Sequence, residues 1–379
     1  MATATFLHYR GSNYLRQRLS LGVLSSKPVK ITDIRSDEDD PGLREYEASY
    51  IRLLDRLTNG STIEINETGT TLIFIPGMIS GGRVEHECSN QRGIGYYLEG
   101  IIALAPFAKH PFQLTLRGIT NSRDDPSVDI VKATSLPLLK RFITEENLQI
   151  KVRRRGALPA GGGDVLFTCP IVRQVRPIQF IDPGKIKRIR GTAFTMRMAP
   201  AIANRVVDAA RGILNKLLPD VYIYTDHFKG DEAGKSPGFG LSLVAESTTG
   251  VVLAVESMSA ERTDSGELTL PEDLGEQTAK MLLEEIWKGG CVDSRNQSLA
   301  FLLMALGQKD LSKIQSGELT SYTVAFLRHL RDFYGVVFRI EPIRAQDNDD
   351  EDEETLELGK RYIMSCVGAG YSNLSKITT

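Results

Sequence analysis

The chain has 379 residues, of which 41% are hydrophobic and 25% are charged, and these ordinary globular values exclude a wholly disordered protein. The length predicts roughly two or three domains, or one large elaborated fold. The longest apolar helical stretch, residues 299–306, is far too short to span a membrane, and no secretory signal is recognisable at the N-terminus. The four cysteines lie far apart, which excludes a zinc ribbon and argues against a disulfide scaffold.

The formal charge of −2 hides an uneven distribution, because eight acidic residues fall within residues 346–357. Without them the rest of the chain is net positive. Such a block repels itself and is typical of a solvated loop or interaction tail. A decoy for a basic partner, or for the protein's own basic groove, is the alternative. The eight acids are Asp347, Asp349, Asp350, Glu351, Asp352, Glu353, Glu354 and Glu357.

Positive charge gathers in two short segments, residues 151–155 and 185–190. Clusters of this kind can bind phosphate-rich ligands. They are equally typical of solvated strand edges, where Lys and Arg oppose edge-to-edge association. The cations are Lys151, Arg153, Arg154 and Arg155 in the first segment, and Lys185, Lys187, Arg188 and Arg190 in the second.

An internal repeat is visible in the first half of the chain. The triplet Asp-Asp-Pro occurs at residues 39–41 and 124–126, each time at a place where proline can start a helix and acids favour its N-terminus. In both copies the pattern predicts a strand before the triplet and, after it, a helix, at least one more strand and a glycine-rich turn. A weaker third copy has only a helix and a strand. The predicted helices span residues 43–57, 127–143 and 319–334, and the strands 31–35, 61–66, 70–76, 112–117, 148–153 and 336–340.

Between the second and third copies lies a segment of a different plan. It predicts a strand, an amphipathic helix, a second strand and a β-hairpin, at residues 189–198, 201–217, 220–226, 240–247 and 250–257. We interpret residues 186–262 as an inserted small α/β domain within a large domain of residues 1–185 and 263–379. The helix expected at residues 271–288 then belongs to the large domain.

Several common sites are excluded. Gly234-Lys235-Ser236 is similar to the end of a P-loop, but Lys229 stands where a glycine is required, and the segment is better explained as a turn before a strand. The five histidines show no metal-ligand spacing, and no Gly-x-Ser-x-Gly elbow is present. We therefore expect no metal and no cofactor.

The most specific motif is residues 155–165, Arg-Gly-Ala-Leu-Pro-Ala-Gly-Gly-Gly-Asp-Val. Three consecutive glycines, Gly161, Gly162 and Gly163, allow positive φ angles, and their N–H groups can form an anion-binding nest. Arg155 would add a bidentate phosphate contact. By composition alone, a simple glycine-rich turn between strands explains the run better.

This run resembles the signature of the RNA 3'-terminal phosphate cyclase family. Residues 27–35, 41–43 and 117–121 are similar to further family landmarks in the expected order, so the resemblance covers nearly the whole chain. It implies a large domain of three α/β repeats, each a four-stranded sheet with two helices, and a smaller inserted α/β domain.

The resemblance also implies a lost activity. Enzymes of this family use a histidine nucleophile near the start of the last long helix, attack ATP, and pass AMP to an RNA 3'-phosphate, which then cyclises. This chain has Tyr322 at that place. A phenol with a pKa of about 10 is mostly protonated at neutral pH and forms no phosphoramidate. His329 lies about two helical turns further on, too far to substitute.

The chain therefore resembles the cyclase-like branch of the family, which is nucleolar. It also shares residues 234–240, 294–297 and 367–376 with that branch. The resemblance implies a non-catalytic role in the small-subunit processome, in early cleavages that produce 18S rRNA. Implied partners are pre-rRNA, a large nucleolar GTPase and snoRNP or other processome components, with no membrane. RNA or other anions would bind through the former cyclase groove, at Lys151, Arg154, Arg155, Gly156 and Gly161 to Gly163.

Two alternatives remain. A pre-rRNA endonuclease needs a general base and a cation, which Arg328, His329 and Arg331 offer beside Asp332. A solvated helix face with an Arg328–Asp332 ion pair explains the same residues. A surviving ATP-dependent cyclase is disfavoured by Tyr322.

Overall fold

The computed structural model describes residues 5–260, 269–343 and 359–376, and three of its sheets share one topology. In each sheet the first strand is parallel to the second, the second is antiparallel to the fourth, and the third lies at the edge beside the fourth. Two helices complete each unit. The predicted fold of three four-stranded repeats is therefore confirmed.

The first two units are continuous in the sequence. The first contains β1 (Leu7–Arg10), α1 (Leu15–Ser25), β2 (Val29–Thr32), α2 (Glu45–Leu57), β4 (Thr62–Ile65) and β5 (Leu72–Ile75), with a small ribbon of β3 (Thr58–Asn59) and β6 (Met78–Ile79). The second contains β7 (Gly81–Glu87), α3 (Ile94–Leu104), β8 (His110–Gly118), α4 (Val128–Ile130), α5 (Leu136–Phe142), β9 (Gln149–Arg154) and β10 (Gly163–Cys169). A π-helical turn at Val131–Ser135 joins α4 and α5 into the one helix that the sequence predicted.

The third unit is complete, although the sequence showed only part of it. It contains β11 (Gln179–Phe180), α8 (Gln297–Leu306), β16 (Leu311–Ser316), α9 (Ser321–Tyr334), β17 (Arg339–Pro342) and β18 (Tyr362–Val367). The insert separates β11 from α8, which hides the repeat. The strand expected at residues 336–340 starts only at Arg339, and the acidic run lies outside the described residues.

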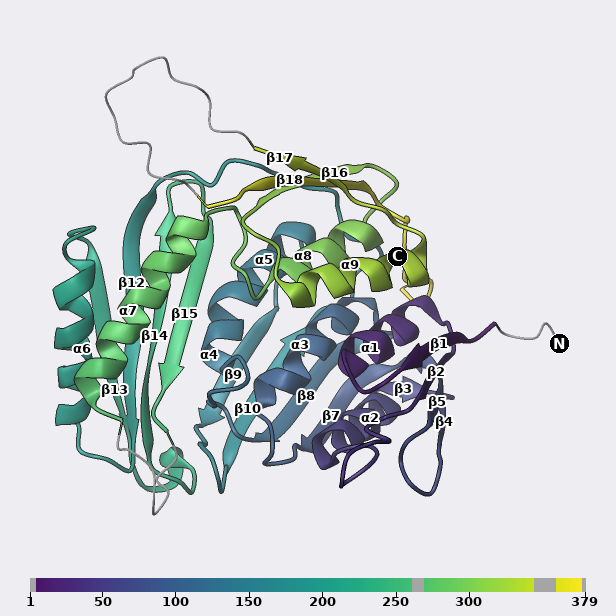
Figure 1. Ribbon diagram of the computed structural model, residues 1–379, viewed down its shortest axis with the longest axis horizontal. Helices are drawn as coiled ribbons and strands as arrows, with labels where there is room; N and C mark the ends of the chain where they lie inside the picture. The colour runs from purple at the N-terminus through teal and green to yellow at the C-terminus, as the bar shows by residue number, and fades with distance from the viewer. Residues whose placement is uncertain (1–4, 261–268, 344–358, 377–379) are drawn as a thin grey trace.

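The insert has its own four-stranded sheet in the order β13-β12-β14-β15. Its elements are β12 (Ile186–Met196), α6 (Ala201–Leu214), β13 (Val221–Phe228), the short helix η3 (Gly230–Ala233), β14 (Gly238–Ser247), β15 (Val252–Met258) and α7 (Pro271–Lys288). In Figure 1, α6 and α7 lie side by side in front of this sheet.

Helix α7 packs with the insert, whereas the sequence prediction placed it in the large domain. A Cβ at Gly275 would lie 2.4 Å from the backbone oxygen of Val206 in α6, so the two helices are in close contact. The repeat plan also has no place for this helix, because α8 and α9 already supply the two helices of the third unit. The predicted boundaries at residues 186 and 262 remain a prediction.

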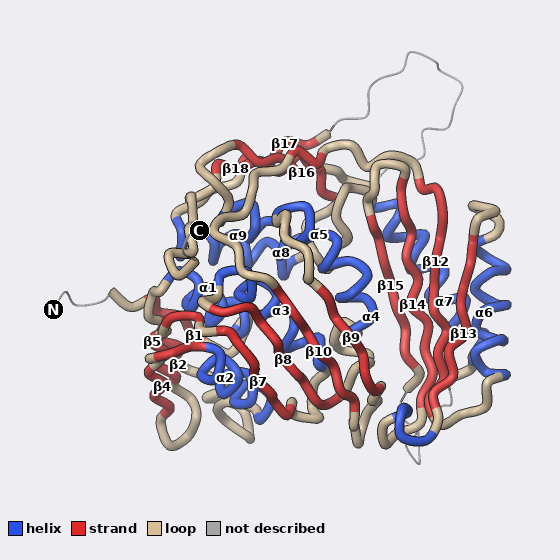
Figure 2. The backbone as a smooth tube through the Cα atoms, turned by 180° about the vertical axis from the view of Figure 1, so that it is seen from behind, coloured by secondary structure: helices blue, strands red, loops and turns tan. Residues whose placement is uncertain are grey.

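The core lies where the helices of the three units meet, with the sheets around them (Figures 1 and 2). Helix α8 is central, and its residues Ala300 to Leu306 are almost completely buried, as its apolar sequence predicted. Among the described residues, no helix combines the length and hydropathy that a membrane span requires.

Candidate functional site

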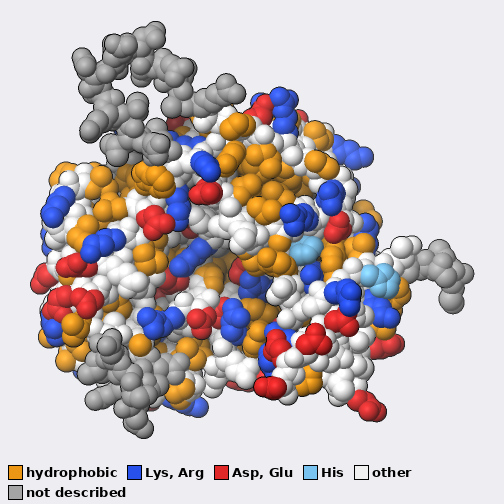
Figure 3. Space-filling model, viewed as in Figure 1, with side chains coloured by type: hydrophobic (Ala, Val, Ile, Leu, Met, Phe, Trp, Pro, Cys, Tyr) orange, Lys and Arg blue, Asp and Glu red, His pale blue; other side chains and the backbone are white. Residues whose placement is uncertain are grey.

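A cavity of about 580 Å³ lies between the insert and the helices of the repeats. Its walls come from α1, α3, α4, the π-helical turn after α4, α7, α8, α9, β15 and the loops at residues 122–126 and 294–296. Figure 3 shows this part of the surface as a hollow with basic and acidic side chains intermixed around it. A pocket of this size, with apolar walls and a few polar groups, is typical of a ligand site.

Tyr322 is one of the residues that line the cavity. It is the second residue of α9, whose start is fixed by Thr320, because the Thr320 hydroxyl accepts a hydrogen bond from the Thr323 backbone N–H at 3.1 Å. The Tyr322 hydroxyl donates to Glu99 Oε1 at 3.0 Å and accepts from Arg16 Nη2 at 3.0 Å. Arg16 and Glu99 also form an ion pair. Burial raises the pKa of Tyr322, so its hydroxyl stays protonated at neutral pH.

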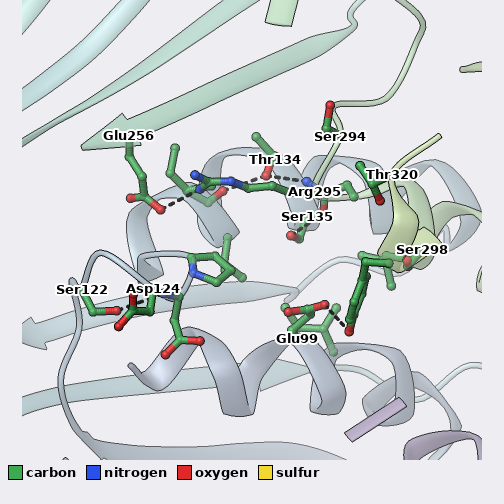
Figure 4. A pocket seen from close by; sticks show the side chains of 18 of the residues that line it. Glu99, Ser122, Asp124, Thr134, Ser135, Glu256, Ser294, Arg295, Ser298 and Thr320 are labelled. Atoms are coloured by element: carbon green, nitrogen blue, oxygen red, sulfur yellow. Dashed lines mark hydrogen bonds and ion pairs between the residues drawn. The ribbon is translucent and has the colours of Figure 1, made fainter. Parts of the chain in front are cut away.

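Two further ion pairs line the same cavity. Arg92 Nε donates to Asp125 Oδ2 at 2.8 Å, and the same oxygen accepts from the Gly93 backbone N–H at 2.7 Å. Arg295 Nη1 donates to Glu256 Oε1 at 2.8 Å (Figure 4). Burial raises the pKa of Glu256, and the neighbouring Arg295 opposes that shift.

Charges in the cavity are balanced. Four arginines and four carboxylates line it, and three of the arginines are paired. An incoming polyanion would meet these carboxylates as well as the arginines, so the cavity is not a strongly positive groove. The arginines are Arg16, Arg92, Arg123 and Arg295, and the acids are Glu99, Asp124, Asp125 and Glu256. Within the described part of the chain, no cluster of three or more His, Cys, Asp or Glu side chains could hold a metal ion.

The glycine-rich signature loop does not line this cavity but packs against the insert. Gly161 and Gly162 have φ angles of +60° and +89°. The Gly161 N–H donates to the Ala157 carbonyl at 2.8 Å, and the Gly161 carbonyl accepts from the Lys235 N–H at 3.0 Å. A Cβ at Gly156 would lie 2.4 Å from the Gly163 nitrogen. The glycines therefore let the backbone of the signature loop pack closely on itself and on residues 234–235 of the insert. The Gly161 N–H is already hydrogen-bonded and is not available to an anion.

Arg155, which the sequence suggested as a phosphate contact, is buried between the second repeat unit and the insert. Arg155 is only 5% exposed, and its guanidinium forms an ion pair with Asp129. The same guanidinium lies 4.9 Å and 4.8 Å from the ring centroids of Phe194 and Phe228 in the insert. Asp129 already neutralises this cation, so a phosphate would have to displace it.

The other members of the first basic cluster are exposed on β9, an edge strand. Arg153 lies 3.7 Å from Asp164, whereas none of the described carboxylates pairs with Lys151 or Arg154. Lys151 and Arg154 therefore keep the charge and exposure that phosphate binding requires.

The nuclease candidates on α9 are not brought together. His329 is only 6% exposed, and its Nδ1 is hydrogen-bonded to Gln17 Oε1 at 3.0 Å. Burial, reinforced by Arg18, lowers the pKa of His329 to about 4. Arg328 and Arg331 are exposed. In the described structure Asp332 interacts with Tyr9 and Arg331, and no ion pair joins it to Arg328.

Sequence reasoning missed most of the cavity's polar groups, because they converge from distant parts of the chain. Arg16 and Glu99 belong to no local sequence pattern that would mark them as site residues. Asp125 is visible in the sequence only as a helix-start signal. The segment at residues 294–297 carries a resemblance to the cyclase-like branch and no chemical signal, and its Arg295 proves to be a cavity residue.

Comparison of the sequence with known proteins identifies the family of this chain. The family model for RNA 3'-terminal phosphate cyclase matches residues 7–340. The human RNA 3'-terminal phosphate cyclase-like protein is 58% identical over 378 residues, which cover 99% of each chain. The probable cyclase-like protein of Drosophila melanogaster is 54% identical over 373 residues, covering 98% of this chain and 97% of that one. The rRNA processing protein rcl1 of Schizosaccharomyces pombe is 43% identical over 380 residues, covering 99% of each. This chain therefore belongs to the RNA 3'-terminal phosphate cyclase family.

Proposed function

We propose that this protein is a non-catalytic rRNA-processing factor. It acts in the nucleolus as part of the small-subunit processome, in the early cleavages that produce 18S rRNA, together with a large nucleolar GTPase and snoRNP components. The name of the Schizosaccharomyces pombe relative supports rRNA processing as the setting. The single observation that carries the non-catalytic part is the environment of Tyr322.

A hydroxyl held between Arg16 and Glu99 is a poor nucleophile. Its proton is shared with a carboxylate and its lone pair accepts from a guanidinium, at 3.0 Å each. Burial raises its pKa further, so the reactive phenolate is disfavoured. Oxygen at this position also could not form the phosphoramidate that a histidine forms with AMP. The environment of Tyr322 thus supports the proposal that this protein has the family's fold but does not transfer AMP.

RNA binding would use exposed cations rather than the charge-balanced cavity. Lys151 and Arg154 are free of described carboxylate partners on an accessible edge strand. Each phosphate contact releases counterions, so affinity should fall steeply as salt rises. Gly156 and Gly161 to Gly163 contribute by fixing the loop that follows β9, and not by direct contact.

The endonuclease alternative has less support in the geometry. A general base must come within hydrogen-bond reach of the proton that it removes. His329 is buried against Gln17, away from the surface on which Arg328 and Arg331 are exposed. The candidates on α9 therefore do not combine an accessible base with a cation for the developing phosphorane charge.

The proposal is tested with the purified full-length protein. We expect no labelled AMP on the protein and no cyclic phosphate on an RNA with a 3'-phosphate when ATP is supplied, and no cleavage of a pre-rRNA fragment. A family enzyme, assayed in parallel, shows that the reaction conditions are competent. Covalent AMP or a cyclic end would contradict the proposal. Cleavage that is lost in His329→Ala would instead establish the nuclease.

A further inference from the structure

One face of the insert's sheet is covered by helices, and the other, the open face, is exposed at the edge strand β13 but covered by Arg155 at Phe194. Helices α6 and α7 cover one face, as Figure 1 shows, and Figure 2 looks onto the opposite face. Strand β13 is at the edge of this sheet, and its Val221 and Ile223 are buried toward α6. Because side chains alternate along a strand, Tyr222 and Tyr224 point to the open face. We propose that this face binds single-stranded RNA, with unpaired bases stacked on Tyr222 and Tyr224.

The two tyrosines form an exposed aromatic platform. Each residue is 55% exposed, and their ring centroids lie 4.4 Å apart at an interplanar angle of 66°. Adjacent exposed aromatic rings can mark an interaction site. Aromatic side chains on the open face of a four-stranded sheet are a common way to stack two or three RNA bases. Such stacking tolerates any sequence, because every base has a π-face.

Positive charge beside the platform complements an RNA backbone. Strand β12 runs parallel to β13, with Arg190 opposite Tyr222 and Thr192 opposite Tyr224. The start of β12 carries the second basic cluster of the sequence. Two of its cations are paired, Arg188 with Glu246 and Arg190 with Asp220. None of the described carboxylates pairs with the other two, Lys185 and Lys187, so these exposed cations are available to phosphates.

The other end of β13 leads to the first basic cluster. Phe228, the last residue of β13, contacts the Arg155 guanidinium, and the Arg155 N–H donates to the Glu232 carbonyl in η3 at 3.1 Å. Arg154 and Lys229 are exposed at this joint, without a described carboxylate partner. The carboxylates of Asp226, Asp231 and Glu232 lie near these two cations, so charge at this end is mixed, and the unpaired cations that favour an RNA backbone are those at the start of β12. This inference deepens the proposed function and rests on it, since it names the surface that would hold the RNA.

The test is equilibrium binding of the full-length protein to a labelled single-stranded oligoadenosine of about a dozen nucleotides, followed by fluorescence anisotropy. We expect Tyr222→Ala with Tyr224→Ala to weaken binding by about tenfold or more, because base–ring stacking is lost. The paired change of both residues to Phe keeps the rings and should retain wild-type affinity. Trp287→Ala removes an exposed aromatic residue of α7, 48% exposed, and serves as the matched control.

Two readouts separate stacking from a loss of fold or of charge. Fluorescence of 2-aminopurine placed in the oligonucleotide should be quenched by the wild-type protein and by the Phe pair. The dependence of affinity on salt should be the same for wild type and the Ala pair, because the rings release no counterions. The proposal is overturned if the Ala pair binds as wild type does, if the Phe pair binds as weakly as the Ala pair, or if wild type binds no single strand.

These outcomes are independent of the proposed cellular role. Normal pre-rRNA processing in cells that lack the protein would overturn the proposed function, whatever the oligonucleotide assay shows. Unaltered binding by the Ala pair would overturn only the tyrosine platform.

Discussion

Arg154 and Arg155 are neighbours in the sequence with opposite surroundings. The Arg155 guanidinium is buried between two phenylalanine rings of the insert and paired with Asp129 from the second repeat unit. Arg154 is exposed at the end of an edge strand. A cation between two parts of a molecule fixes their relative position, whereas an exposed cation is available to ligands. The sequence alone assigned both residues to the same task.

Alanine at each position should therefore affect a different property. We expect Arg155→Ala to lower the free energy of unfolding by about 3 kcal/mol, because it leaves the Asp129 carboxylate without its partner. Arg154→Ala should change it by less than about 0.5 kcal/mol, as is usual at the surface. Urea unfolding measures both. Binding to single-stranded RNA should weaken in Arg154→Ala, and equal stability of the two variants would contradict this assignment.

At the level of elements, two helical glycines illustrate what packing requires. Gly275 in α7 faces α6 so closely that a Cβ would lie 2.4 Å from the Val206 oxygen and 3.1 Å from the Ala209 Cβ. A Cβ at Gly212 in α6 would meet open space, with no neighbouring atom within 4 Å. Glycine is unfavourable in both helices, but only at Gly275 does the structure depend on it. This contact is one of those that hold α7 on the insert, together with its packing on β14 and β15.

The same substitution should therefore act in opposite directions at the two glycines. Gly275→Ala is expected to destabilise the protein by about 1–3 kcal/mol, because the backbone of α6 must move. Gly212→Ala should be neutral or stabilise it by up to about 1 kcal/mol, through helix propensity. Thermal or urea unfolding of the full chain compares them. Destabilisation by both changes, or by neither, would show that α7 does not pack on α6 in this way.

On the scale of the whole molecule, the sequence predicted the local elements well and their convergence poorly. The helix at residues 43–57 and the strand at 112–117 follow from periodicity and turn residues, which are local signals. The third repeat was only partly visible, since a complete domain interrupts it after β11. The cavity was not predictable, because Arg16, Glu99 and Tyr322 are joined only by tertiary packing.

The assembly of repeats and insert also places two kinds of surface on one molecule. The cavity is amphipathic and balanced in charge. The open face of the insert and the edge strand β9 are exposed and carry unpaired cations. Under the proposed function, the exposed surfaces would hold RNA, and the cavity around Tyr322 would carry out no transfer chemistry.

The most direct test of this account is depletion of the protein from its own cell, followed by probes that span the early cleavage sites of 18S pre-rRNA. We predict that uncleaved small-subunit precursor accumulates while large-subunit RNA is spared, and that re-expression of the wild-type chain restores cleavage. Normal precursor processing after depletion would contradict the role in rRNA processing and would reopen the chemistry of RNA ends.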